Sequence, residues 1–282
     1  MKPKVVIFLT LLFISQFGVT QNTNDLEFRR MGSIDLYFSP GHETEALFIA
    51  QLTHDANIYL HTLLGPQEEQ IHVYALSRTD WGIFTDPRII YGLHHVNRRR
   101  MMAPSDPSAI PPPLTQLMEM LITGFGYELA RSTLHGMNIH ELGHVWFSTG
   151  NRFRQRLWLE EVFCNLTQVA YFSEKKTEYM EPLLALGLAN LNVNPEELRI
   201  TSLDLFETDG FSIARVAPLN YGWYQARFLE MARKLYAAGG PEVLKNLWEF
   251  LGKYQVRLSD EELVQKLGEE VHPFFVDMIR NW

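Results

Sequence analysis

The sequence predicts an α+β fold in which a small N-terminal mixed sheet with helices is followed by an all-helical C-terminal lobe. Residues 34–38 and 70–76 have the apolar patterns of strands, and the segment between them, residues 43–64, has helical spacing. A proline-rich break at residues 104–113 follows, and beyond it nearly every segment has helical periodicity. These three observations place the sheet before the break and the helices after it.

The N-terminal lobe is expected to span about residues 30–110, with two further short antiparallel strands at residues 89–93 and 99–103. The helical lobe is expected to span about residues 113–282. Ser259 begins a capping box there, because Glu262 lies three residues after it. The helices are expected at residues 114–121, 131–147, 158–173, 177–190, 219–238, 241–252, 260–268 and 273–281.

Residues 1–20 have the pattern of a secretory signal peptide. Lys2 and Lys4 precede the run of residues 5–14, which is apolar except for Thr10, and small residues follow. The run is too short to span a bilayer comfortably, so we expect cleavage after Thr20 and a secreted or periplasmic protein without a membrane span. A retained N-terminal anchor is the alternative.

The composition argues against a nucleic-acid-binding protein and against a protein with an internal disulfide. The net charge is −8 and no long basic run occurs, which argues against binding to nucleic acid. The chain has a single cysteine, Cys164, so an internal disulfide is excluded, and we interpret Cys164 as a small buried apolar residue. The sequence gives no indication of the oligomeric state.

The motif His140-Glu141-Leu142-Gly143-His144 is the strongest functional signal. Residues four apart lie on one face of a helix, so both imidazoles can bind one metal ion. Glu141 then lies where it could accept a proton from a water molecule at that ion. Two histidines, a carboxylate ligand and a glutamate base are the parts of a zinc hydrolase, so Zn²⁺ is the expected cofactor.

The third ligand is expected from the segment 157–161, where Glu160 and Glu161 are adjacent. Neighbouring helical residues point about 100° apart, so only one of them can serve. Helical periodicity does not choose between the two. Glu161 shares a face with Asn165, which could hydrogen-bond a ligating histidine.

H-E-L-G-H followed by L-W-L-E-E resembles the gluzincin metallopeptidases, the clan of thermolysin and of the aminopeptidase-N type enzymes. The resemblance implies a zincin-like fold over residues 21–282, a peptidase MA-like catalytic domain with its active-site cleft between the two lobes. It implies His140, His144 and Glu161 as zinc ligands and Glu141 as the general base. Only residues 131–165 carry specific motifs.

The same resemblance implies a tyrosine that stabilises the oxyanion, at the start of a helix after the third ligand. Tyr221 is the first choice and Tyr224 the second. An edge strand above the metal is expected within residues 93–102, with His94 and His95 close to the substrate. The G-x-M-E-N strand of aminopeptidases is missing upstream of His140, so aminopeptidase specificity is not implied.

The sequence thus predicts a secreted zinc metallopeptidase that hydrolyses peptide bonds of a peptide or protein substrate. The alternatives are a catalytically inactive binding or scaffold protein with the gluzincin fold and a zinc hydrolase of non-peptide substrates. The intact Glu141 argues against an inactive site. Neither cleavage specificity nor exo- versus endopeptidase action follows from the sequence.

Overall fold

The structure is a computed structural model, and it describes residues 25–282 except 68–69, 86–88, 90, 93, 98, 112–113, 192–194, 199 and 217. The signal peptide expected at residues 1–20 lies outside the described residues. Within them, no helix combines the length and the apolar character that crossing a membrane requires.

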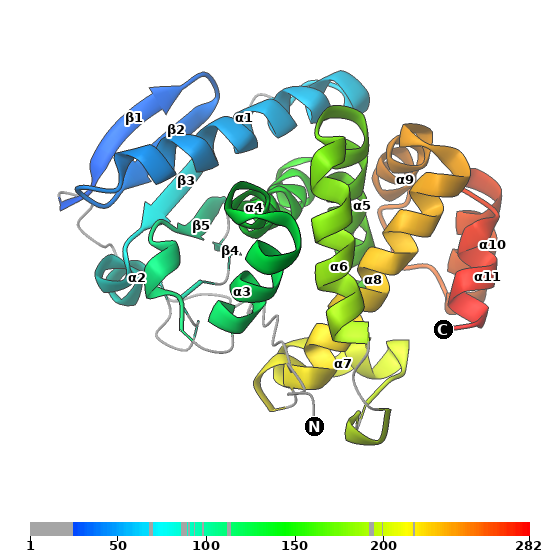
Figure 1. Ribbon diagram of the computed structural model, residues 1–282. Helices are drawn as coiled ribbons and strands as arrows, with labels where there is room; N and C mark the ends of the chain where they lie inside the picture. The colour runs from blue at the N-terminus through cyan, green and yellow to red at the C-terminus, as the bar shows by residue number, and fades with distance from the viewer. Residues whose placement is uncertain are drawn as a thin grey trace.

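A mixed sheet lies at one end of the molecule (Figure 1). Among the described residues its strand order is β1-β2-β3-β5-β4, with β2, β3 and β5 parallel to one another and the outer strands β1 and β4 antiparallel to their neighbours. This arrangement confirms the predicted mixed sheet and makes β4 an edge strand. The strands are β1 (Glu27–Met31), β2 (Ile34–Phe38), β3 (Ile71–Leu76), β4 (His95–Asn97) and β5 (Arg100–Pro104).

The two faces of the sheet differ because side chains alternate along each strand. Leu36 of β2 pairs with Val73 of β3, and both are fully buried. On the other face Tyr37 pairs with Tyr74, and their rings stack with centroids 4.8 Å apart. The apolar face is the one that helices can cover.

Helix α1 (Glu43–Leu64) has the bounds that the sequence predicts, and it packs along β2 and β3. Helix α4 (Tyr127–Thr149) packs beside α1 and contacts β4 and β5. The short helix α2 (Arg78–Phe84) is capped by Ser77, whose hydroxyl accepts a hydrogen bond from the Asp80 amide. Helix α4 therefore connects the sheet to the helices that follow it.

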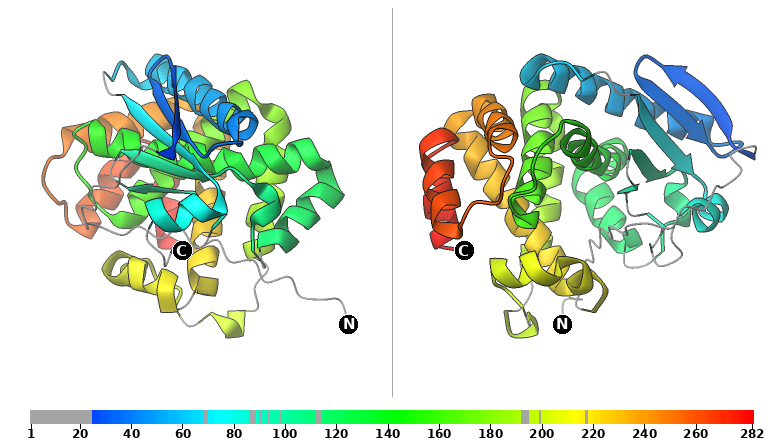
Figure 2. Two further views of the ribbon diagram at one scale, coloured as in Figure 1. Left: turned by 90° about the vertical axis from the view of Figure 1, so that its left-hand side faces the viewer. Right: turned by 180° about the vertical axis from the view of Figure 1, so that it is seen from behind.

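The rest of the chain is helical, and the C-terminal helices lie at the end of the molecule away from the sheet (Figures 1 and 2). Helix α5 packs against both α4 and α8, and α6 packs against α8. The predicted α+β class with an N-terminal sheet followed by helices is confirmed, whereas the division into two lobes stays a prediction. The remaining helices are α3 (Leu114–Phe125), α5 (Leu157–Lys175), α6 (Met180–Leu191), α7 (Leu203–Val216), α8 (Pro218–Gly239), α9 (Pro241–Lys253), α10 (Asp260–Glu270) and α11 (Phe274–Arg280).

The strand predicted at residues 89–93 is wrong for the residues described there. Tyr91 and Gly92 form a turn, and Gly92 has a φ of +106°, which a strand does not accommodate. The apolar character of this segment has another cause, because the side chains of Ile89 and Tyr91 are buried although the segment is not a strand. The Tyr91 hydroxyl also donates a hydrogen bond to the Leu76 carbonyl. Strand β4 instead begins at His95, within residues 93–102, where the edge strand is expected.

Helices α4 and α5 cross at very short range. A Cβ atom placed on Gly143 would lie 2.8 Å from the Cα atom of Cys164, and one on Gly136 would lie 2.5 Å from the ring of Phe172. The contact at Gly143 is with the backbone, which cannot move aside as a flexible side chain could. Gly143 therefore sets the distance between the two helices.

Replacing Gly143 with alanine is expected to destabilise the protein by about 1–3 kcal/mol, the usual range for an overpacked core. The measurement is the free energy of unfolding from urea denaturation. Gly124 of α3 is the matched control, because nothing lies within 4 Å of its Cβ position. Alanine there should be neutral or stabilising by up to about 1 kcal/mol. Equal effects at the two glycines would contradict the role of Gly143.

Candidate metal centre

Helix α4 places the two histidines of the motif side by side. His140 and His144 are 4% and 2% exposed, and their ring centroids lie 5.0 Å apart. The Nε2 atom of His140 has no aligned hydrogen-bond partner among the described residues. A buried imidazole nitrogen without such a partner is unfavourable in a protein interior, but a bound metal ion would satisfy it.

Helix α5 brings Glu161 to the same point. Its Oε2 atom lies 3.3 Å from His140 Nε2 and 3.8 Å from His144 Nε2. Two ligands that are each about 2 Å from one tetrahedral zinc ion lie roughly 3.3 Å apart, so the spacing fits an ion of that size. Glu161 is 2% exposed, and both histidines hold the pKa of its carboxyl below the usual value despite its burial.

Glu160 faces the other side of His144. The Nδ1 of His144 donates a hydrogen bond of 2.8 Å to Glu160, which also forms an ion pair with Arg154. This bond directs the Nε2 atom of His144 toward Glu161. Burial disfavours the protonated imidazole, but Glu161 and Glu160 outweigh burial and raise the pKa of His144 to about 9. The carboxylates thus make the site attractive to a cation.

Cys164 is the other residue close to the histidines. His140, His144 and Cys164 form a buried cluster that could hold a metal ion, since one potential ligand atom from each lies within 4.8 Å of the others. Burial, followed by the charges of Glu160 and Glu161, raises the pKa of the thiol well above its usual value. Because metals bind the thiolate, these carboxylates disfavour Cys164 as a ligand.

Glu141 is fully buried, and neither carboxyl oxygen has an aligned hydrogen-bond partner in the described parts of the chain. Burial raises the pKa of this carboxyl to about 8, although His144 and the backbone N–H of Val96 act in the opposite direction. Val96 belongs to β4, so Glu141 lies close to the edge strand as well as to His144. A carboxyl with a pKa near neutrality suits proton transfer.

Helix α8 supplies the two remaining polar groups. Tyr221 is 2% exposed, and the nearby charges of Glu161 and Glu141 add to burial in raising the pKa of its phenol. Gln225, one turn later, interacts with Tyr221 and donates a hydrogen bond of 3.1 Å to Glu161 Oε2. Tyr224 instead donates a hydrogen bond to the Ser202 carbonyl. The structure therefore brings Tyr221, and not Tyr224, to the carboxylates.

His94 lies just before β4, His95 is the first residue of β4, and both side chains are buried. His135 Nε2 donates a hydrogen bond to Glu45, so in its neutral form its Nδ1 accepts from His94 Nε2, 3.3 Å away. Burial holds the pKa of both His94 and His135 below the usual value. These hydrogen bonds connect the residue before the edge strand to His135 of α4, which lies just over one turn before the motif.

Two residues of the site were not assigned these positions from the sequence. The sequence leaves Glu160 open as a ligand, but it hydrogen-bonds His144, a role expected of Asn165. The Asn165 amide instead donates to the Glu161 carbonyl oxygen. The role of Gln225 could not be predicted from the sequence, because Gln225 and its partner Glu161 are 64 residues apart in the chain.

Comparison of the chain with models of known protein families found no match, and comparison with curated proteins found none either. The motif and the geometry of the site are therefore the features that indicate a function.

Proposed function

We propose that this protein is a zinc-dependent metallopeptidase of the gluzincin type. The observation that carries the proposal is the position of Glu161 Oε2, which lies 3.3 Å from His140 Nε2 and 3.8 Å from His144 Nε2, in a site that also holds the buried carboxyl of Glu141. His140, His144 and Glu161 are the proposed ligands. The alternative third ligand, Cys164, would add a thiolate to a site that already holds three carboxyl groups.

When bound at these ligands, a zinc ion supplies Lewis-acid polarisation of a peptide carbonyl and lowers the pKa of water. Glu141 takes the proton of the attacking water and passes it to the leaving amine. Tyr221 donates a hydrogen bond to the oxyanion that develops on the substrate. The edge strand β4, next to Glu141, aligns the substrate backbone.

The proposal is tested with residues 21–282, purified and assayed on a pool of quenched fluorescent peptides beside ester substrates. Cleavage of peptides that a zinc chelator stops and added zinc restores is the expected result. Hydrolysis of esters alone would favour the hydrolase of non-peptide substrates. One zinc per chain without any hydrolysis would favour the binding or scaffold protein.

Gln225 is expected to hold Glu161 in position for the metal. Replacing Gln225 with leucine removes the 3.1 Å hydrogen bond to Glu161 at similar side-chain size, and zinc affinity should fall about 10- to 100-fold. Gln168→Leu is the matched control, because Gln168 is equally buried but donates to the Gly136 carbonyl. Competition with a fluorescent chelator measures both affinities, and equal losses would exclude a specific role for Gln225.

A further inference from the structure

Helix α8 carries two residues of the candidate site in its first turns. Tyr221 lies close to the carboxylates of Glu161 and Glu141, and Gln225 donates a hydrogen bond to Glu161. Misplacing a reacting group by about 1 Å can cost about 100-fold in rate. The contacts that hold the first turns of α8 in place therefore bear directly on the proposed reaction.

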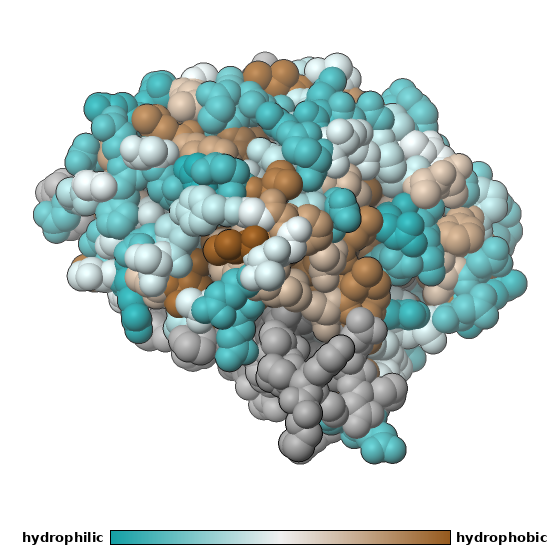
Figure 3. All heavy atoms as spheres, in the orientation of Figure 1, coloured by the Kyte–Doolittle hydropathy of each residue, from teal (hydrophilic) through white to brown (hydrophobic). Residues whose placement is uncertain are grey.

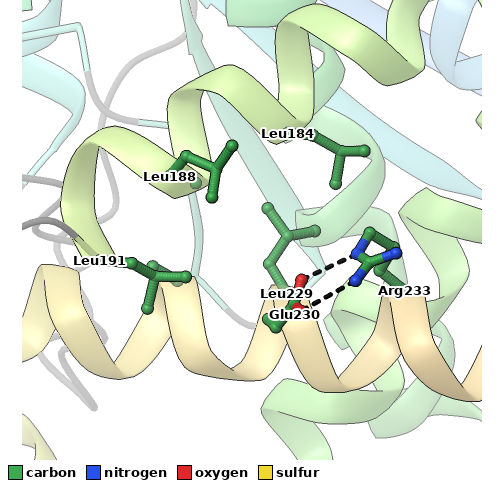
Figure 4. A pocket seen from close by; sticks show the side chains of 8 residues that line it. Leu184, Leu188, Leu191, Leu229, Glu230 and Arg233 are labelled. Atoms are coloured by element: carbon green, nitrogen blue, oxygen red, sulfur yellow. Dashed lines mark hydrogen bonds and ion pairs between the residues drawn. The ribbon is translucent and has the colours of Figure 1, made fainter.

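The side of α8 that faces α6 is incompletely packed. A cavity of about 220 Å³ lies between the two helices, and Figure 4 shows Leu184, Leu188 and Leu191 of α6 across from Leu229 of α8. Leu188 is 55% exposed, and hydrophobic side chains gather over α6 on the face shown in Figure 3. Side chains that line a cavity lose dispersion contacts, so α6 holds this stretch of α8 less firmly than a close-packed neighbour would.

Another side of α8 is packed by a cluster of aromatic rings, here called the Trp282 cluster, which connects α8 with α7 and with the residues after α11. Its members are Phe206, Trp223, Tyr224, Phe228 and Trp282. The partly buried ring of Trp282 stacks on those of Tyr224 and Phe228, with centroids 6.0 Å and 5.3 Å away. Trp223 meets the Trp282 ring edge-on at 5.9 Å. One side chain from outside α8 thus contacts three of its residues.

Polar contacts fix the orientation of the Trp282 ring. Its Nε1 donates a hydrogen bond of 2.7 Å to the Thr201 carbonyl, and the Arg227 guanidinium lies 4.8 Å from the ring centroid. The Tyr224 hydroxyl donates a bond of 2.6 Å to the Ser202 carbonyl. Trp282 and α8 are therefore both bound to the short segment that precedes α7.

Phe206 of α7 connects the Trp282 cluster to the site. Its ring is 1% exposed and lies 4.9 Å from the rings of both Tyr224 and Phe228. The same ring stacks with that of Tyr221 at 6.2 Å. Close-packed side chains transmit a displacement to their neighbours, so a change at Trp282 can reach Tyr221 through these rings.

We propose that Trp282 is a positioning residue that holds the first turns of α8, and through them the Tyr221 hydroxyl, at the metal centre. It acts through Tyr224, Phe228 and Phe206 and not on the substrate. This inference rests on the proposed peptidase function, because that function gives the Tyr221 hydroxyl its role.

The kinetic test compares three variants at saturating zinc. Trp282→Leu removes the stacked ring, and kcat should fall about tenfold while KM changes less than about threefold. Trp282→Phe keeps a ring for stacking, so its kcat should stay within about threefold of wild type. Tyr254→Leu is the matched control, because Tyr254 is a partly buried aromatic residue at the end of α9 that contacts Phe250, Lys253 and Lys266. Its kcat should also stay within about threefold of wild type.

A double-mutant cycle shows whether Trp282 acts through Tyr221. Tyr221→Phe alone should lower kcat by about 10²- to 10³-fold, because it removes the donor to the oxyanion. In that background Trp282→Leu should change kcat less than about twofold, since the group that it positions is gone. The full tenfold loss in both backgrounds would overturn the inference, and so would equal losses in Trp282→Leu and Tyr254→Leu.

Hydrogen exchange tests the same role without turnover. Trp282→Leu should speed exchange of the α8 amides of residues 221–228 by about tenfold or more and leave α9 unchanged. Faster exchange in α8 without peptide cleavage by wild type would keep Trp282 as the residue that holds α8 and overturn the peptidase. Unchanged exchange would overturn the inference whatever the activity. If Trp282→Leu does not fold, Trp282→Met replaces it, because methionine adapts to irregular space. Unfolding of both variants would assign Trp282 to the stability of the whole fold and overturn the inference.

Discussion

Replacing Glu141 with glutamine is expected to lower kcat by at least 10²- to 10⁴-fold while zinc stays bound. Glutamine has nearly the shape of glutamate but cannot accept the proton of the attacking water, and the loss of a general base has effects of this size. The burial of Glu141 and the pKa of about 8 that burial gives its carboxyl fit this role. The measurement is single-substrate kinetics together with metal analysis of the same preparation.

The fold of the Glu141→Gln variant should survive the change. Neither carboxyl oxygen of Glu141 has an aligned hydrogen bond in the described residues, so the substitution breaks no such bond there. An unchanged thermal transition and one zinc per chain would separate a catalytic defect from unfolding. Activity within tenfold of wild type would rule out Glu141 as the base and with it the proposed mechanism.

The long elements could be predicted from the sequence because their pattern is local. Helix α1 has regular apolar spacing over 22 residues and Gly65 directly after its last residue, so its predicted bounds are those observed. The capping box at Ser259 likewise marks the start of α10 and is present in the structure. In such segments the burial pattern, the spacing and the end signals all agree.

The elements that were missed lack a local signal. Strand β1 is exposed at four of its five residues, so it shows no apolar alternation, and only its pairing with β2 identifies it. Helix α2 has seven residues, too few for periodicity to be recognised. Helix α7 was also missed, although part of its apolar surface packs against α5 and α8.

The candidate site shows the same division between local and distant contacts. His140, Glu141 and His144 are recognisable because five consecutive residues of one helix carry the arrangement. The separate roles of Glu160 and Glu161 follow only from how α5 packs on α4, which Gly143 and Cys164 determine at their crossing. Tyr221 and Gln225 reach the site through the packing of α8 on α5, which no sequence spacing shows.

Zinc binding is expected to depend far more on Glu161 than on its neighbour. Glu161→Ala removes a carboxylate that lies 3.3 Å and 3.8 Å from the two histidine Nε2 atoms, and zinc should be lost from the purified protein. Glu160→Ala removes the hydrogen bond to His144 Nδ1, and loss of such a partner typically weakens metal binding by about 10- to 100-fold. Elemental analysis, followed by competition with a chelator, measures both effects.

Cys164→Ala is the third variant in this series and decides between the two candidate third ligands. The small side chain of alanine fits the crossing at Gly143, so the α4–α5 contact should be kept and one zinc per chain should remain. Retention of zinc by Glu161→Ala together with its loss from Cys164→Ala would show that the cluster of His140, His144 and Cys164 is the metal site. In that case Cys164 would bind the metal as a thiolate, and Glu161 would be a buried carboxylate close to the metal but not a ligand.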